Sequence, residues 1–319
     1  MHKLLRRALW TGALVGAPAL ANAMIAARAG TPTTPLPGDI GYYEWTYGRV
    51  TYYRMGTGTP LLLVHHPSVG GSAWEWRKVF PALAESFTVY AVDLLGCGLS
   101  DRPALPYTGP LLADLVHDFL EDVVGQAASA IGSGLGAAYL VNVAVRRPQF
   151  LDRLVLVNPV GSVVMGSALL EEAARLAMAA PVVGETVYNA LTRRAALAQA
   201  LARVYFDPRA VTPELIDTTY TLAHQPGSRY AGGAYLTGGL DCPMRLAFAD
   251  LTQPVMLVWS RDATHTPAAD AADLVYRQPK ARVEIMERCG LVPHDEAAGI
   301  FLTLAQKFLQ EPEIGQLAA

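Results

Sequence analysis

The feature that most constrains the fold is an alternation of short apolar runs with segments of helical period. The apolar runs are continuous and bounded by turn residues, which is typical of parallel strands buried on both faces. Residues 61–65 form such a run and residues 89–93 a second buried strand. Further strands are expected at residues 127–133, 154–158, 255–260 and 282–286, and helical periods occupy residues 74–87, 110–124, 135–147 and 297–309. Together with two earlier strand-like runs, at residues 42–47 and 49–54, they predict an α/β fold with a mostly parallel, eight-stranded sheet and helices on both faces.

A block without strand patterns interrupts this alternation. Between Gly161 and about Ala249 the helical periods are punctuated by prolines at positions 181, 208, 213 and 226. An all-helical block inserted into such a sheet predicts a lid over the sheet's carboxyl edge, where open α/β sheets bind ligands. We therefore expect a core at residues 41–160 and 250–310, a helical lid at residues 161–249 and a tail at residues 311–319.

The N-terminal segment is long, uncharged and preceded by basic residues. Lys3, Arg6 and Arg7 come before a run from residue 8 to residue 27 that carries no charge, which is long enough for a helix to cross a bilayer. Because the basic residues come first, such an anchor at residues 1–30 would keep the N-terminus cytoplasmic, with the globular domain on the exported side after a linker at residues 31–40. The alternative is a signal peptide cleaved near Ala21-Asn22-Ala23, which would give a secreted protein.

The composition argues against several classes of function. A net charge of −3 leaves no electrostatic footprint for a nucleic acid, and the 52% apolar content supports a large core. Cys97, Cys242 and Cys289 are too few and too far apart for paired metal ligands or a disulfide framework. The histidines at positions 65, 66, 224, 265 and 294 lack metal-ligand spacing, so we expect neither a metal nor a cofactor.

A set of motifs in fixed order identifies the fold more closely. The motifs are LLLVH at residues 61–65, DLLGCGLSDRP at 93–103, GSGLG at 132–136, LVLVNP at 154–159, WSRD at 259–262 and GLVPHDE at 290–296. In this order they resemble the α/β-hydrolase superfamily, in its lid-bearing branch of esterases, haloperoxidases and lyases. The resemblance runs from about residue 42 to residue 309, and it implies a nucleophile, a histidine base, an oxyanion hole and an acid at fixed places.

The nucleophile position of that family is occupied here by a glycine. In the family the nucleophile lies on a sharp strand-to-helix turn between two small residues. Gly132 and Gly136 fill the small positions, so the resemblance places Gly134 where the nucleophile belongs, and glycine has no side chain to attack with. Ser133 does not replace it, because the residues that would flank it, at positions 131 and 135, are bulky.

The base and the oxyanion hole also depart from the family's pattern. Leu291 stands at the base position, and His294 matches a neighbouring position that is usually structural in the family. The N–H of Leu135 is kept as one oxyanion donor, whereas Pro67 stands at the other donor position and has no N–H. The loop glycine before Pro67 is replaced by His66. Loss of one such donor costs about 3 kcal/mol of transition-state stabilisation.

The acid position alone matches the pattern. Asp262 stands there, but without a histidine to orient we expect it to cap or pair locally. We therefore expect a degraded catalytic triad at Gly134, Asp262 and Leu291, and no hydrolysis by acyl transfer. Candidate pocket residues are His66, Trp74, Cys97 and His294.

Two functional hypotheses follow from these features. The first is a membrane-anchored protein without nucleophile or base that serves as a ligand-binding or structural subunit of a membrane-associated complex. Its partners would be membrane lipid, other membrane-protein subunits and a small apolar ligand, with no nucleic acid. The second is a non-covalent enzyme (a lyase, an isomerase or an atypical hydrolase) that acts on a small apolar substrate, with Asp262, His66 or His294 as proton carrier. The second hypothesis requires these groups to converge in a pocket beneath the lid.

Overall fold

One eight-stranded sheet organises the chain, with the spatial order β1-β2-β4-β3-β5-β6-β7-β8. The protein is described from a computed structural model, which covers residues 2–33, 36–161, 168–263 and 266–312. The strands are β1 (Asp39–Trp45), β2 (Gly48–Met55), β3 (Thr59–Val64), β4 (Phe87–Val92), β5 (Ala128–Ser133), β6 (Leu151–Val157), β7 (Val255–Ser260) and β8 (Arg282–Met286). The pairs β1–β2 and β2–β4 are antiparallel and the other neighbours are parallel, so the predicted mostly parallel sheet is confirmed.

The central strands are buried on both faces, as their apolar runs predict. In β3, Leu62 and Val64 pack into one core, Leu61 and Leu63 pack into the other, and all four are inaccessible to solvent. Because side chains alternate along a strand, each continuous apolar run supplies both cores. The first core includes residues of α3 (Gly109–Phe119), α4 (Leu135–Arg146), α10 (Arg245–Ala249) and α11 (Ala268–Arg277). The second includes residues of the 3-10 helix η1 (Ala73–Trp76), α2 (Phe80–Leu83) and α13 (Ala298–Leu309).

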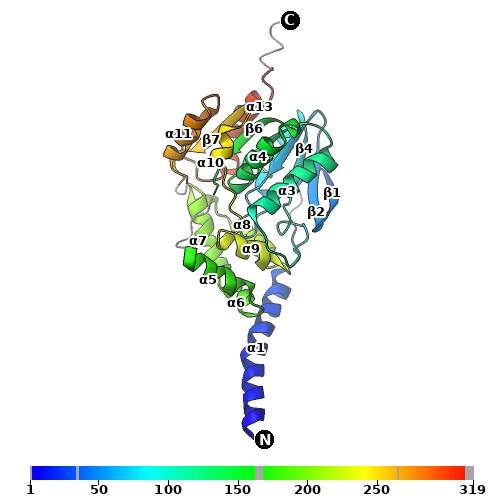
Figure 1. The fold of residues 1–319 in the computed structure, drawn as a ribbon, viewed down its shortest axis with the longest axis vertical. Helices are drawn as coiled ribbons and strands as arrows, with labels where there is room; N and C mark the ends of the chain where they lie inside the picture. The colour runs from blue at the N-terminus through cyan, green and yellow to red at the C-terminus, as the bar shows by residue number, and fades with distance from the viewer. Residues whose placement is uncertain (1, 34–35, 162–167, 264–265, 313–319) are drawn as a thin grey trace.

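Five helices between β6 and β7 form a helical insertion at one end of the sheet (Figure 1). They are α5 (Ala168–Ala179), α6 (Val183–Leu191), α7 (Arg194–Val204), α8 (Pro213–Ala223) and α9 (Ser228–Leu236). The predicted helical block extends to residue 249, but α10 carries Phe248 into the first core and belongs to the sheet's covering layer. Residues 162–167, at the start of the predicted block, lie outside the described part of the chain.

The first helix, α1 (His2–Ala29), ends against the helical insertion. Asn22 is buried there, and its Nδ2 donates to the Val182 carbonyl oxygen at 3.3 Å and to Thr186 Oγ1 at 3.1 Å. At the end of the helix, Thr221 Oγ1 donates to the carbonyl oxygen of Ala29 at 3.0 Å. The N-terminal half of α1 extends away from the rest of the molecule (Figure 1).

The predicted single-pass membrane anchor is wrong. Within the described parts of the chain, no helix combines the length and apolarity needed to cross a membrane. The prediction counted the whole uncharged run, but that run contains Asn22, which is bound to the insertion. The residues between Arg7 and Asn22 span about 21 Å as an α-helix, less than the roughly 30 Å of a bilayer's hydrocarbon core. The localisation derived from the anchor, with the globular domain on the exported side, is corrected with it.

The helix predicted at residues 74–87 is also wrong in extent. The structure has a 3-10 turn that ends at Trp76 and a single α-helical turn at Phe80–Leu83, and Phe87 already begins β4. Phe80 begins the second turn, and Pro81, its second residue, has no N–H with which to continue a helix from the first. The predicted limits of β7 and β8 are confirmed, and residues 313–319 of the predicted tail lie outside the described chain.

Candidate functional site

The centre of the candidate site is the sharp turn between β5 and α4. Gly134 occupies it with φ 54° and ψ −116°, a conformation that glycine adopts without the strain imposed by a side chain. Gly136 lets the start of α4 pack against the end of β3, since a Cβ atom there would lie 2.6 Å from the carbonyl oxygens of Val64 and His65. The turn therefore requires glycine at position 136, whereas at position 134 glycine removes the strain that a side chain would bring.

The imidazole of His66 fills the space above Gly134. The N–H of Leu135 donates to His66 Nδ1 at 3.1 Å, and His66 Nε2 lies 3.3 Å from the hydroxyl oxygen of Tyr235 on α9. A Cβ atom on Gly134 would approach Nδ1 more closely than Cβ atoms approach any neighbour in proteins, and would lie 3.1 Å from Cγ of the ring. A side chain at position 134 and the His66 ring therefore compete for the same space.

His66 is held in its neutral form at this position. Burial lowers the pKa of His66 from 6.5 to about 4, although the nearby Glu75 carboxylate opposes this shift. Because Nδ1 accepts the Leu135 N–H, the remaining ring proton resides on Nε2 and points toward Tyr235. Burial also raises the pKa of Tyr235, so both groups carry no net charge near neutral pH.

A buried carboxylate fixes the backbone of His66. Glu75, in η1, accepts the His66 backbone N–H on Oε2 at 3.0 Å, and His294 Nε2 lies 3.0 Å from its Oε1. Burial alone would raise the pKa of Glu75, but the contact with His294 and the charges of neighbouring histidines lower it to about 2. Sequence analysis did not single out Glu75, because nothing in its local pattern marks a carboxylate that closes over a loop nine residues away.

His294 lies beneath the site rather than in it. Its side chain is fully buried, and its ring centroid lies 4.4 Å from that of Trp76 and 5.8 Å from that of Phe301. The neighbouring Asp295 bonds Arg77 Nη2 at 2.8 Å and is likewise buried. His294 is therefore enclosed by aromatic rings and by Glu75.

The other two family positions, Asp262 and Leu291, form hydrogen bonds of their own. Asp262 is exposed and accepts the backbone N–H of Arg288 at 2.9 Å on Oδ2. Leu291 donates its N–H to the Val204 carbonyl oxygen at 2.6 Å. Asn158, which has a positive φ of 39°, joins the loop of Leu291 to the sheet: its Nδ2 donates to the Leu291 carbonyl oxygen at 3.1 Å and to Ser260 Oγ at 3.0 Å.

Two further sequence candidates lie near the loop that follows β3. Pro67 is buried directly after His66, and the Ser68 N–H turns back to the His66 carbonyl oxygen at 2.8 Å. Trp74 is half-buried, and the Arg77 guanidinium carbon lies 3.9 Å from its ring centroid. Trp74 therefore packs against Arg77 rather than against His66.

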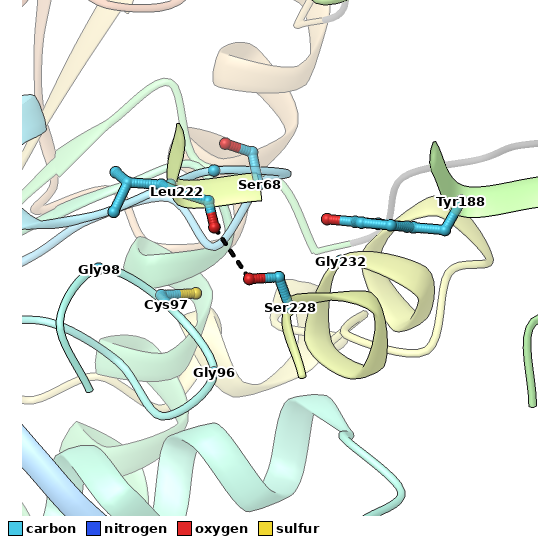
Figure 2. A pocket seen from close by; sticks show the side chains of 10 residues that line it. Ser68, Gly96, Cys97, Gly98, Tyr188, Leu222, Ser228 and Gly232 are labelled. Atoms are coloured by element: carbon cyan, nitrogen blue, oxygen red, sulfur yellow. Dashed lines mark hydrogen bonds between the residues drawn. The ribbon is translucent and has the colours of Figure 1, made fainter. Parts of the chain in front are cut away.

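A small cavity lies beside this loop, where the core meets the helical insertion (Figure 2). Its volume is about 10 Å³. It is lined by Ser68, Gly70, Gly71, Gly96, Cys97, Gly98, Tyr188, Leu222, Ser228 and Gly232. Cys97 lines this cavity, but burial raises the pKa of its thiol to about 12, so it lacks the thiolate character of a nucleophile.

One group of side chains in the described chain has the residue types and spacing of metal ligands. The ligand atoms of His117, Asp118 and Glu121 lie within 4.8 Å of one another. Asp118 Oδ2 is already engaged by Trp45 Nε1 at 2.8 Å, and Glu121 is exposed. Of the histidines considered from the sequence, His224 bonds Thr192 within the insertion at 3.1 Å, and position 265 lies outside the described residues.

Comparison with known proteins identifies the family. A model of the alpha/beta hydrolase family matches residues 61–302. The chain belongs to this family. It is similar to 2-hydroxymuconate semialdehyde hydrolase of Pseudomonas sp. (strain CF600), with 26% identity over 281 residues, which are 85% of this chain and 93% of the relative.

Solved structures share the fold. The meta-cleavage product hydrolase of Pseudomonas fluorescens IP01 superposes with a TM-score of 0.71 at 22% identity, over 84% of this chain and 97% of that one. A structure described as a membrane phospholipase A, a novel bacterial virulence factor, superposes with a TM-score of 0.69 at 21% identity, over 97% of this chain and 96% of that one. At these identities the structural likeness concerns the fold alone.

The first functional hypothesis is corrected by these comparisons. It described a non-catalytic, membrane-anchored subunit of a membrane complex. The curated relative and the meta-cleavage product hydrolase structure carry the names of hydrolytic enzymes, and no helix among the described residues can cross a membrane. Both premises of the hypothesis, the anchor and the lack of any enzymatic role, therefore lose their support.

Proposed function

We propose that this protein is a non-covalent enzyme of the alpha/beta hydrolase family that acts on a small, largely apolar carbonyl compound. In this proposal His66 carries the proton. The observation that carries it is the position of the His66 imidazole: the ring lies over Gly134 and accepts the N–H of Leu135, the one oxyanion donor that the family pattern retains here. A titratable side chain therefore lies next to the turn at which the family pattern has its nucleophile and one oxyanion donor.

The proposal excludes a covalent intermediate because the necessary groups are missing from their positions. Gly134 offers no nucleophile, Leu291 accepts no proton, and Pro67 donates no N–H. Of the three proton carriers considered from the sequence, Asp262 is exposed and bound to Arg288, and His294 is sealed beneath Trp76. His66 alone remains next to the turn.

The contacts of His66 suggest how it would act. A substrate carbonyl oxygen that takes over the Leu135 N–H would free Nδ1, and the same N–H would then stabilise negative charge on that oxygen. The freed, neutral Nδ1 would accept a proton from the carbon next to the carbonyl, giving an enolate and an imidazolium. If the imidazolium exchanges this proton with solvent before the same carbon is reprotonated, the result is hydrogen exchange; delivery of a proton to a different carbon is isomerisation. The Glu75 carboxylate favours the transient imidazolium, since its charge raises the pKa of His66.

Two further observations bear on the substrate. The relative from Pseudomonas is named for a semialdehyde, which is a carbonyl compound, in line with the proposed substrate class. The cavity of about 10 Å³ between core and insertion is too small for an organic substrate and is not lined by His66, so in this proposal the helical insertion moves to make room for the substrate beside the His66 ring. Tyr235 belongs to that insertion and contacts His66, so movement of α9 would also release the ring.

The proposal is tested by deuterium exchange. A series of small ketones and aldehydes of increasing apolar size is incubated with the protein in D₂O, and loss of the proton signal next to the carbonyl is followed by NMR. The wild type should exceed the buffer rate, and His66→Gln, which keeps an acceptor for the Leu135 N–H but cannot take up a proton as a base, should return to it. His117→Gln, on α3, is the matched control and should exchange like the wild type.

Two results would contradict the proposed function. Binding of a ketone without any exchange above the buffer rate would mark the protein as a binder rather than an enzyme. Stoichiometric labelling of the wild type by a fluorophosphonate probe would show that a nucleophile is present after all.

A further inference from the structure

The cavity between core and insertion has a polar side chain that the protein leaves without a partner. Tyr188, on α6, is 2% exposed, and its hydroxyl has no hydrogen-bond partner among the described residues. Figure 2 shows this hydroxyl directed toward the cavity from the side opposite Cys97. Leaving a buried hydroxyl without a partner destabilises the folded state, so this group calls for a ligand.

The cavity matches a single hydroxyl-sized ligand in volume and chemistry. Its volume of about 10 Å³ is close to the minimum that accommodates one water molecule, about 10–15 Å³. Ser228 Oγ donates its proton to the Leu222 carbonyl oxygen at 2.9 Å, which leaves its lone pairs free to accept. A water molecule can accept from Tyr188 and donate to Ser228, the combination that these two side chains require.

We propose that this cavity is a binding site for one water molecule, held between Tyr188 and Ser228 at the junction of the core and the helical insertion. Gly232, which lines the cavity, leaves the space that the Tyr188 hydroxyl needs. A Cβ atom on Gly232 would lie 2.5 Å from the Tyr188 hydroxyl, so a larger residue would displace that hydroxyl from the cavity.

A pair of tyrosine variants tests this site. In a high-resolution crystal structure of the wild type, water density should lie within hydrogen-bond distance of Tyr188 Oη, and Tyr188→Phe should lose it. Tyr107→Phe is the matched control, because Tyr107 is also buried with an unpartnered hydroxyl among the described residues but does not line the cavity. This control should retain the water.

The same variants give a second readout in solution. Tyr188→Phe should lower the folding equilibrium constant about fivefold, the effect of losing one satisfied hydrogen bond. The proposal is overturned if the wild type shows no water at this position, if the water persists in Tyr188→Phe, or if that variant is as stable as the wild type.

A different set of contacts concerns how the insertion is held in place. The C-terminal end of α1 bridges two helices of the insertion: Asn22 bonds Thr186 on α6, and Ala29 accepts from Thr221 on α8. Asn189 Nδ2 also donates to Asn22 Oδ1 at 3.0 Å, and Gln225 Nε2 donates to the Gly30 carbonyl oxygen at 2.9 Å. The bridged helices, α6 and α8, contribute Tyr188 and Leu222 to the cavity wall.

From this bridge we infer that α1 is a clasp that holds α6 and α8 of the helical insertion together, and with them the cavity wall that covers Cys97. Separation of α6 from α8 opens this wall and exposes Cys97, which lines the cavity on the core side. The rate at which a thiol reagent reaches Cys97 therefore reports the fraction of open molecules.

Thiol labelling tests the clasp in the full-length chain. The background carries Cys242→Ala and Cys289→Ala, so that Cys97 is the one remaining thiol. Asn22→Ala, which removes the bonds to α6, should speed alkylation of Cys97 by iodoacetamide about tenfold. Leu20→Ala is the control, because Leu20 lies on the same helix and is 65% exposed, and it should label at the background rate.

Global unfolding is measured in parallel to separate it from local opening. The inference holds if Cys97 in Asn22→Ala labels faster than global unfolding in urea accounts for. It fails if the labelling rates of Asn22→Ala and Leu20→Ala are equal, or if the increase follows global stability alone.

Discussion

The relation between Gly134 and His66 gives a quantitative prediction. Replacing Gly134 with alanine forces a side chain into φ 54° and ψ −116°, which costs about 1–3 kcal/mol. The new Cβ also overlaps His66 Nδ1 and lies 3.1 Å from Cγ of the same ring. Overpacking of this kind costs about a further 1–3 kcal/mol. Gly134→Ala should therefore lower the free energy of unfolding by about 2–6 kcal/mol.

A double-mutant cycle with His66→Ala separates the two contributions. In the His66→Ala background the ring is gone, so Gly134→Ala should cost only its backbone strain, about 1–3 kcal/mol. The coupling free energy between the two positions, measured by urea unfolding of the four proteins, should be about 1–3 kcal/mol. Gly299→Ala, in α13, is the control: a Cβ there meets nothing within 4 Å, and the variant should be slightly more stable. Costs that add within about 0.5 kcal/mol would refute the claim that the two positions share one space.

Three further predictions concern the groups around the turn. The pKa of His66 is lowered from 6.5 to about 4 in the folded protein, so as the pH falls the unfolded state takes up a proton on His66 before the folded state does. The stability that depends on neutral His66 is therefore complete above pH 6.5 and declines by about 3 kcal/mol as the pH falls to 4. Urea unfolding of the wild type and of His66→Gln across this pH range should show this decline as a difference between the two proteins. Glu75→Gln should destabilise the protein by about 2–3 kcal/mol at pH 7 in urea unfolding, because it weakens the acceptor of the His66 N–H and removes the charge beside His294. Asn158→Ala should lower the thermal unfolding midpoint and cost about 2–4 kcal/mol, since it strips the buried bonds to Ser260 and Leu291 and leaves a non-glycine residue at positive φ; an unchanged midpoint would contradict this.

The regular part of the fold could be predicted from the sequence, because each element carries its own signal. The fully buried apolar run of β7 predicted that strand to the residue, and the limits of β8, an edge strand that is partly exposed, were predicted as well. Gly132 and Gly136 located the turn, since the close approach of α4 to β3 demands glycine there. Such signals lie in consecutive residues, so they can be recognised without knowing which distant segments pack against them.

Contacts between segments that are far apart in the sequence could not be predicted from local patterns. The helix predicted at residues 74–87 is shorter for two reasons: Pro81 interrupts it locally, and at its end Phe87 pairs with Thr59 in the sheet, a contact that the local pattern does not reveal. The N-terminal run was taken for an anchor because the bonds from Asn22 to the insertion lie 160 or more residues away in sequence. The role of Glu75 was missed for the same reason, as its partners belong to two other loops.

The departures at positions 66 and 134 are best understood as one change in packing. Considered separately, His66 replaces the loop glycine of the family pattern, and Gly134 leaves the turn without a nucleophile. The ring of His66 occupies the volume that any side chain at position 134 would need, so histidine at position 66 is accommodated only when position 134 is glycine. The Leu135 N–H, which would be left buried without a partner once the site is filled, is satisfied by His66 Nδ1. A variant that restores serine at position 134 should therefore gain nothing unless His66 is also reduced to glycine, and the pair of changes should be better tolerated than Gly134→Ser alone.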